Sequence, residues 1–225
     1  MRGAAQSDWL LWQLADSAFP TGGFAHSGGL EAAYQYGEVT GRDDLLAFLQ
    51  AALRQCGSSS LPFVAAVFDR THSLDHADAF CDAFTSNHVA NRASRLQGRA
   101  FVNSAARAFA LSALAEIRDR MAESESPAHF APVFGEVTRL LGLERVEAFR
   151  LFLFTQLRGW ISSAVRLNIV GPIEAQSIQG RVSTLAEEVL QACSGLSLDD
   201  AVQTAPLLDL FQNGQERLYS RLFQS

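Results

Sequence analysis

ERVEAFRLFLFTQLRGWISSAVRL, residues 144–167, is the stretch that decides the fold class of this chain. It is long and strongly apolar, and its residues do not alternate as those of a half-buried strand do. Phe149, Phe152 and Phe154 fall at the spacing of a helical core. The stretch therefore predicts a central buried helix, and Gly171-Pro172 beyond it starts the next helix.

Helical patterns continue outward in both directions, and no run of about four to eight residues alternates convincingly as a strand would. Ser126-Pro127 has the composition of a helix start. The predicted helices are 9–14, 30–36, 42–56, 63–71, 74–92, 93–121 with a break near Gly98, 133–141, 144–167, 173–193, and one that opens at 197–200 and is interrupted by Pro206. We therefore expect an all-α protein: a single globular helical domain of about nine to ten helices over residues 1–211, and a mobile C-terminal tail over residues 212–225.

Composition excludes several classes of protein. The chain has 225 residues, of which 48% are hydrophobic and 19% charged, so it can bury a sizeable core. Its net charge of -6 argues against general binding to nucleic acid and against adsorption to an anionic membrane surface. No apolar run approaches the roughly 18 residues of a membrane span. We therefore expect neither a nucleic acid nor a membrane among its partners.

Residue types and motifs that are missing from the sequence exclude further classes of function. All 18 basic residues are arginine, so a lysine-containing phosphate loop is excluded, and so is a lysine Schiff base. Cys56, Cys81 and Cys193 lie far apart and form no C-x-x-C pair, which predicts free thiols. Residues 1–8 lack the apolar core of a signal peptide. These features together predict a cytoplasmic protein.

A catalytic or metal site is a weaker interpretation of the sequence. A site near His26 and Glu31 would need a nucleophile, but Phe24 to Gly28 does not match G-x-S-x-G and follows no strand. His72 and His76 would share one face of a helix, yet H-E-x-x-H and a third ligand are missing. We favour a solvated first helical turn for this pair, while adventitious nickel or zinc binding stays open. No tightly bound cofactor and no catalytic residue is predicted.

Two segments do not fit an ordinary core. Residues 16–31 combine Pro20 with four glycines and His26, and such loops often carry function. Residues 215–223 mix apolar and aromatic side chains with Arg217 and Arg221, which is typical of a docking element that orders on binding. In a helix, the apolar residues of this second segment would form one stripe. The alternative is a last helix packed on the domain's own core.

These segments carry a family resemblance. LADSAFPTGGFAHSGGLE, residues 14–31, is similar to the N-terminal signature of the UreF family, D-S-x-x-P-x-G-x-F-x-H-S-x-G-L-E, and meets each fixed position. Residues 97–101 and 163–167 resemble segments in the middle of that family. Residues 216–225 resemble its ending, H-E-x-x-Y-S-R-L-F-x-S, although Gln215 stands where histidine is common. A second departure is Pro172-Ile173, which replaces a glutamine-centred turn.

The resemblance implies an all-α homodimer that acts in urease maturation. In that family the protein is a non-catalytic adaptor: it bridges the accessory protein UreD, also called UreH, and the GTPase UreG. The complex acts on apo-urease and handles the nickel, and the adaptor regulates when GTP is hydrolysed. The alternative hypotheses are a helical metal-binding protein or enzyme with a site near His26 and Glu31 or near His72 and His76, and a plain helical scaffold.

The resemblance also implies two groups of partner-binding residues. The group on the GTPase side or the dimer face is Phe24, His26, Ser27, Glu31 and Arg166. The group in the C-terminal tail, which is associated with binding to UreD or UreH, is Glu216, Arg217, Leu218, Tyr219, Arg221, Leu222 and Phe223. Without imidazole at Gln215, no tail role that depends on a proton or a metal ion is implied.

Overall fold

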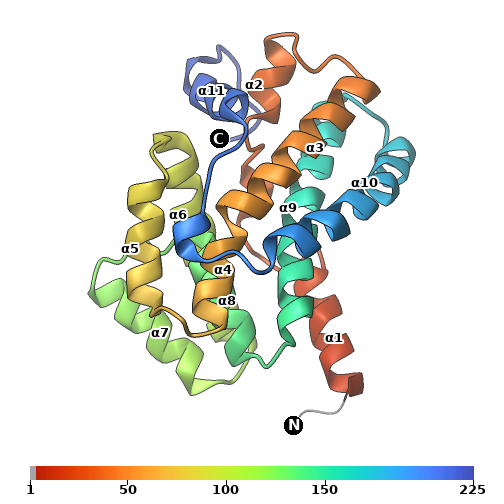
Figure 1. Cartoon of the computed structure of the whole chain (residues 1–225). Helices are drawn as coiled ribbons and strands as arrows, with labels where there is room; N and C mark the ends of the chain where they lie inside the picture. The colour runs from red at the N-terminus through yellow and green to blue at the C-terminus, as the bar shows by residue number, and fades with distance from the viewer. Residues whose placement is uncertain (1–3) are drawn as a thin grey trace.

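The computed structural model describes residues 4–225, so residues 1–3 of the N-terminal stretch considered above lie outside the described residues. The helices are α1 (Ala4–Ala15), α2 (Leu30–Gln35), α3 (Arg42–Ser59), α4 (Leu61–Phe68), α5 (Leu74–Phe84), α6 (His88–Ala108), α7 (Ser112–Glu123), α8 (Phe130–Leu140), α9 (Arg145–Arg166), α10 (Pro172–Cys193) and α11 (Pro206–Gly214) (Figure 1). Short 3-10 turns cover Gly23–Ala25, Leu198–Asp200 and Gln215–Arg217. No strand occurs within the described range, and the all-α prediction is confirmed.

The central helix α9 follows the prediction closely. Its start is closed by a capping box, in which the N–H of Glu144 donates to the Glu147 carboxylate at 3.2 Å. Phe149, Phe152 and Leu157 are buried, and α9 packs against α1, α3, α4, α8 and α10. Burying each such side chain contributes about 1.5–3 kcal/mol, so this helix organises the core.

Aromatic packing joins α9 to α6 and α8. Phe101, Phe130, Phe134 and Phe152 form a cluster whose neighbouring ring centroids are 5.2 to 5.7 Å apart. Such ring pairs contribute about 0.5–1.5 kcal/mol beyond the area that they bury. Of the three phenylalanines singled out by their spacing in α9, Phe149 and Phe152 are buried and Phe154 is half-buried.

Two glycines allow α6, α8 and α4 to approach closely. A Cβ at Gly98 in α6 would overlap the carbonyl oxygen of Ala128, and one at Gly135 in α8 would lie 2.5 Å from the carbonyl oxygen of Val64. Atoms that are not bonded to each other cannot approach so closely without a shift of the backbone. Gly98 is therefore a packing residue inside a continuous helix and not a helix break.

The helix boundaries near α5 and α6 correct the prediction. The segment 74–92 is not one helix, because the side chain of Asn87 accepts two hydrogen bonds, at 3.0 and 3.2 Å, from N–H groups in the first turn of α6. α6 then runs through Gly98, and the chain breaks at 109–111, between α6 and α7. One short polar side chain thus sets a boundary that helical periodicity does not reveal.

The structure also differs from the prediction at two prolines. Ser126-Pro127 does not open α8, which begins at Phe130 with His129 as its N-cap. The hydroxyl of Ser126 instead donates to the buried carboxylate of Asp78 at 2.5 Å. Pro206 does not interrupt a helix but occupies the first turn of α11, where its missing N–H is no loss.

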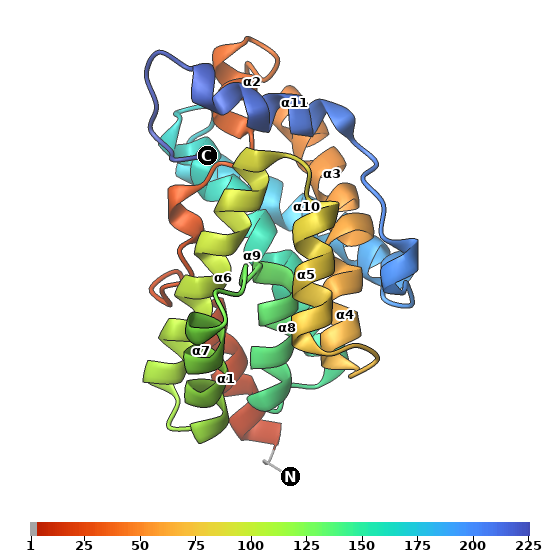
Figure 2. The same ribbon diagram turned by 90° about the vertical axis from the view of Figure 1, so that its left-hand side faces the viewer.

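The two ends of the described chain lie at opposite ends of the molecule. α1 lies at one end, whereas α2, α11 and the C-terminus gather at the other (Figures 1 and 2). Trp9 and Trp12 in α1 are 70% and 59% exposed, so their rings lie on the surface at this end of the molecule. Within residues 4–225, no helix has both the length and the hydropathy that crossing a membrane requires.

Candidate functional site

The two segments singled out in the sequence lie side by side. The loop before α2 and the residues after α11 meet beside the last turn of α9, at the end of the molecule that holds the C-terminus (Figures 1 and 2). We call this region the signature–tail junction and define it as residues 22–31, Arg166 and residues 214–225. It brings together residues that the family resemblance assigns to two separate partner-binding groups.

Glycine shapes the loop side of the junction. Gly28 and Gly29 have φ angles of 62° and 90°, in the left-handed region where glycine is favoured. A Cβ at Gly28 would lie 2.6 Å from the Trp160 indole nitrogen, and one at Gly29 would lie 3.1 Å from the backbone of Gln212. The glycines therefore let the chain turn into α2 while it packs closely against α9 and α11.

Glu31 is the centre of the junction. Glu31 is only 1% exposed, and its carboxylate accepts hydrogen bonds from the tail. Oε1 accepts the N–H of Leu222 at 2.6 Å, and Oε2 accepts the N–H of Phe223 at 3.1 Å and the Nε2 of Gln215 at 2.5 Å. A buried carboxylate is tolerated when it is hydrogen-bonded in this way. Burial of Glu31 therefore depends on the tail, and the packing of the tail depends on Glu31.

Gln215 fills the position where the resemblance leads us to expect histidine. It is fully buried, and besides Glu31 its Nε2 reaches the carbonyl of Phe223 at 3.3 Å. Among the described residues, its Oε1 finds no hydrogen-bond partner. The amide thus supplies a hydrogen-bond donor to Glu31 at the position where imidazole was expected.

His26 and Ser27 hold the end of the tail. The N–H of Ser27 donates to the carbonyl of Ser225 at 2.5 Å, and the N–H of Gln224 donates to the carbonyl of Ala25 at 2.8 Å. Nδ1 of His26 lies 2.6 Å from the hydroxyl of Ser225. Burial lowers the pKa of His26, and the positive charge of Arg92 lowers it further. The ring is therefore neutral in the folded protein near pH 7.

This shifted pKa predicts an acid-sensitive stability. The unfolded chain binds a proton at His26 below its ordinary pKa of 6.5, while the folded chain resists it. The contribution of His26 to the free energy of unfolding is therefore present above pH 6.5. It is lost as the pH falls below 6.5, by at most about 1.4 kcal/mol per pH unit for one group. We expect urea denaturation at several pH values to show a shallower fall for His26→Asn than for the unmodified chain. Parallel curves would contradict this prediction; His129, whose pKa burial also lowers, contributes to both.

Arg166 joins the loop to the tail through two aromatic rings. Its guanidinium carbon lies 3.8 Å from the centre of the Phe24 ring and 4.1 Å from that of Phe223. Its Nη1 also donates to the carbonyl of Phe24 at 2.6 Å. A planar guanidinium stacks on aromatic faces in a way that lysine does not. Phe223 is buried beneath the arginine, whereas Phe24 is 70% exposed above it.

The rest of the tail corrects the helical-stripe interpretation. Only Gln215–Arg217 forms a 3-10 turn, and an irregular loop follows, so no helical apolar stripe forms. Glu216 pairs with Arg92 at 2.6 Å and with the His88 ring at 2.9 Å, and these partners lower the pKa of its carboxyl to about 2. We expected a mobile tail, but burial of Phe223 and Ser225 packs its end on the domain.

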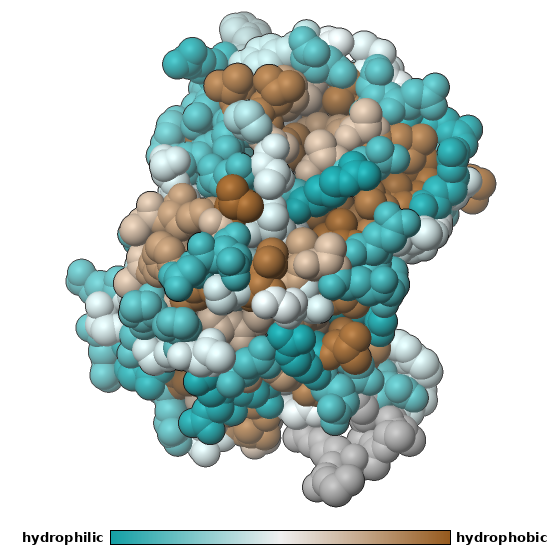
Figure 3. Space-filling view, viewed as in Figure 1, coloured by the Kyte–Doolittle hydropathy of each residue, from teal (hydrophilic) through white to brown (hydrophobic). Residues whose placement is uncertain are grey.

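The middle of the tail remains on the surface. Tyr219 is fully exposed and Leu222 is 51% exposed, while Leu218 is half-buried. Arg217 and Arg221 are exposed on either side. Apolar side chains also gather over neighbouring α11, where Leu207 and Leu210 are exposed (Figure 3). The junction therefore fixes both ends of a loop whose middle is free to make contacts.

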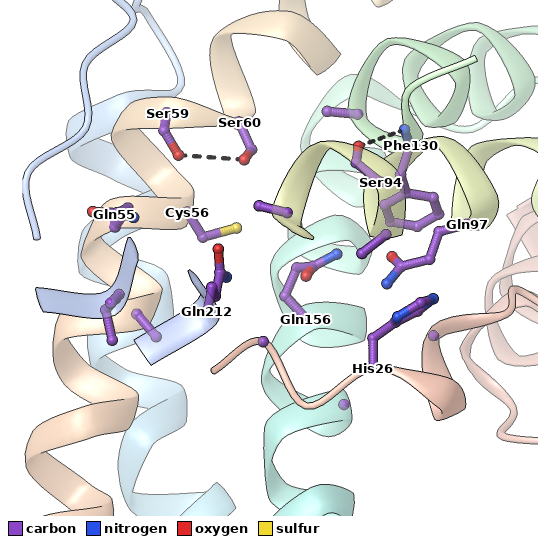
Figure 4. A pocket seen from close by; sticks show the side chains of 18 of the residues that line it. His26, Gln55, Cys56, Ser59, Ser60, Ser94, Gln97, Phe130, Gln156 and Gln212 are labelled. Carbon is purple, nitrogen blue, oxygen red and sulfur yellow. Dashed lines mark hydrogen bonds between the residues drawn. The ribbon is translucent and has the colours of Figure 1, made fainter. Parts of the chain in front are cut away.

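A chamber lined by both polar and apolar side chains lies behind the junction. Its volume is about 220 Å³, and His26, Gln97 and Gln156 point into it from the loop, α6 and α9 (Figure 4). Other lining residues include Gln55, Cys56, Ser94, Gln212 and Ser225. Burial raises the pKa of the Cys56 thiol to about 12, so this cysteine is inert at neutral pH. Amides and hydroxyls suit water or a small neutral molecule better than an ion.

One buried histidine, at the start of α8, carries no sequence motif. His129 Nδ1 lies 3.1 Å from the hydroxyl of Ser94, and its Nε2 lies 3.0 Å from the Asp82 carboxylate. The Ser94 hydroxyl also accepts the N–H of Phe130 at 3.2 Å. Since His129 is fully buried, this chain of hydrogen bonds fixes the start of α8 against α5 and α6. Partners so distant in sequence leave no spacing signal.

The other metal candidates do not converge. The rings of His72 and His76 are stacked with centroids 5.0 Å apart and an interplanar angle of 16°. Asp75 lies 3.8 Å from Arg120. Over the described part of the chain, no three histidine, cysteine or acidic side chains are placed to hold a metal ion together.

Comparison with known proteins gives consistent matches. The UreF family model matches residues 39–183. Urease accessory protein F of Arabidopsis thaliana is 40% identical over 231 residues, covering 100% of this chain and 95% of the relative. Urease accessory protein F of Oryza sativa subsp. japonica is 38% identical, covering 96% and 84%. Urease accessory protein UreF of Mycobacterium tuberculosis is 36% identical, covering 93% and 95%.

Proposed function

Since this chain belongs to the UreF family of urease accessory proteins, which are maturation factors and not enzymes, we propose that it is an adaptor in nickel insertion. In this proposal it bridges UreD, or UreH, and the GTPase UreG on apo-urease, and regulates GTP hydrolysis. The observation that carries the proposal is the signature–tail junction, where a buried carboxylate holds an exposed loop in one conformation.

The exposed surface of the junction supports a role in partner binding. Phe24, Tyr219 and Leu222 are large apolar side chains on the surface, with Arg217 and Arg221 beside them. Aromatic residues and arginine are enriched among the side chains that dominate binding energy. A loop already fixed at both ends also loses less conformational entropy on binding. We propose that residues 218–222 contact UreD or UreH.

Nickel is, in this proposal, the cargo of the complex. His26 and Glu31 already bond to the tail, so neither is an unengaged ligand for a metal ion. The chain also has no lysine for a phosphate loop, which supports an effect on the GTPase by contact and not by binding nucleotide. The three free cysteines are consistent with the reducing cytoplasm, where we propose that the complex acts.

We further propose that the protein is a homodimer. The groove between α9 and α10 supports this, because it has a volume of about 540 Å³ and a mostly apolar lining. Its floor includes Leu153, Phe154, Leu157, Ala186 and Leu190. An apolar groove on one face suits the self-complementary contact of a two-fold dimer.

The proposed function is tested by reconstituting the complex. The chain is purified with UreD or UreH and with UreG from one source, and the mass of the mixture is measured by light scattering. A stable complex with two copies of each protein is the expected result. If those partners assemble with another UreF but not with this chain, the adaptor proposal is wrong.

Tyr219→Ala is predicted to weaken binding of UreD or UreH about tenfold or more. Tyr219 is fully exposed and makes no core contact, so its loss should leave folding unchanged while removing an aromatic anchor. Ile173→Ala is the matched control, because Ile173 is 85% exposed at the start of α10, outside the junction. Biolayer interferometry measures both variants, and equal affinities would remove Tyr219 from the proposed contact.

A further inference from the structure

A row of arginines follows one face of α6. Arg92, Arg95 and Arg99 are spaced by three and four residues, so their side chains lie on the same side of the helix. Arg118 of α7 extends the row. We call these four residues the arginine stripe. Figure 2 shows the two helices that carry it, α6 and α7.

The protein surface along the arginine stripe is concave. Two shallow hollows of about 470 Å³ each share Arg95 and Arg99. One also contains Arg92 and His88, and the other contains Arg118. Among all the residues that line the two hollows, Glu125 is the one acidic side chain. A positive surface is thus concentrated on a chain whose net charge is -6.

Many guanidinium N–H donors of the arginine stripe have no partner within the described residues. Arg95 lies 4.0 Å from Asp82, at the limit of an ion pair, and its side chain is 39% exposed. Arg99 donates to the carbonyl of Ser126 at 3.3 Å and, within the described residues, forms no ion pair. Arg118 pairs with neighbouring Asp119 at 2.7 Å. Each guanidinium carries five N–H donors, so one such contact leaves several available.

One carboxylate of the tail already pairs with the arginine stripe. Glu216 sits at one end, where its two carboxylate oxygens meet Arg92 at 2.6 Å and His88 at 2.9 Å. Leu96, between Arg95 and Arg99 on the same helix, is 46% exposed and offers apolar contact beside the charges. The exposed loop of the tail begins directly after Glu216. A segment lying along the stripe would therefore continue the proposed partner surface.

We propose that the arginine stripe is a docking surface for an acidic segment of a partner protein in the urease-maturation complex. The carboxylates of that segment would pair with Arg95, Arg99 and Arg118, next to the tail. Arginine matches carboxylates with two parallel hydrogen bonds. A nucleic acid is disfavoured because Asp82, Asp119 and Glu125 border the stripe and would repel a continuous phosphate backbone. This inference rests on the adaptor function proposed above.

The test compares two double charge reversals. Arg95→Glu with Arg99→Glu reverses the two central charges of the stripe, whereas Arg54→Glu with Arg181→Glu makes the same charge change at exposed positions on α3 and α10. Each variant is titrated by biolayer interferometry with purified UreD or UreH, UreG and apo-urease at about 50 and 300 mM salt. For one partner we expect at least tenfold weaker binding to the stripe variant, a reduced salt dependence, and unchanged binding to the control.

The outcomes separate the two proposals. If the unmodified chain binds its partners and the stripe variant binds each of them equally well, the stripe inference is wrong and the adaptor proposal stands. If the unmodified chain binds none of them, both are wrong. Binding of a duplex or single-stranded oligonucleotide that is lost in the stripe variant would also overturn the protein-partner inference. Arg95→Gln with Arg99→Gln, expected to give an intermediate loss, keeps the test decisive if the reversal reduces folding.

Discussion

Glu31→Ala should release the C-terminal segment from the domain and lower capture of UreD or UreH at least about tenfold. The substitution removes the carboxylate that accepts from Gln215, Leu222 and Phe223. A buried polar group left without its partner costs about 1–3 kcal/mol, and three would lose theirs at once. Releasing the tail restores those bonds with water, so the free loop is favoured. The helical core does not depend on this contact.

Trypsin reports the release directly. The chain has no lysine, so cleavage in the tail can occur only after Arg217 and Arg221. We expect mass spectrometry to show much faster cleavage at these two sites in Glu31→Ala than in the unmodified chain. Glu38→Ala, at an exposed carboxylate shortly after α2, is the matched control. Equal cleavage in all three proteins would show that Glu31 does not hold the tail.

Gly98→Ala should be the most destabilising of the small substitutions considered. The added methyl would overlap the backbone carbonyl of Ala128, which cannot rotate away as a side chain could. The start of α8 would have to move away from α6, disturbing the contacts of His129 and the ring of Phe101 nearby in α6. Overpacking typically costs about 1–3 kcal/mol, and a clash with backbone lies at or above the top of that range.

Gly159→Ala, at another glycine within a helix, should instead stabilise the protein. Apart from the nearby backbone of its own helix, no heavy atom of the described residues lies within 4 Å of a Cβ at Gly159, so alanine fits. The higher helix propensity of alanine should add about 0.5–1 kcal/mol. Urea denaturation of the two variants measures both changes in the unfolding free energy. A Gly98→Ala protein as stable as the unmodified chain would mean that α6 and α8 are not in the described contact.

The sequence predicts the fold best where local signals agree. The apolar run of α9, its acidic start and the Gly171-Pro172 step mark one long helix within about a residue at each end. The boundary at Asn87 is missed because a single cap decides it. Gly98 resembles a break because glycine weakens helices, whereas its actual reason, contact with the start of α8, depends on tertiary structure.

The candidate site is only half visible in the sequence. The glycine-rich loop and the aromatic tail are recognisable as unusual segments, but nothing local indicates that they bind each other. Glu31 is an example: a carboxylate in the first turn of a helix is ordinary at a helix N-terminus, so its burial under the tail cannot be predicted. The contacts of His129 and the chamber behind the junction are missed for the same reason, because the residues that form them come from several helices.

The length of chain between the two sides of the junction has a consequence for biosynthesis. The hydrogen bond from Leu222 to Glu31 joins residues 191 positions apart, so closing it requires nearly the whole chain to be collapsed first. During translation the helices that form the core emerge before the tail does, and domains generally begin to fold as they appear. The junction must therefore be among the last contacts made. A ribosome-bound intermediate can hold a formed core and still lack the surface that a partner would bind.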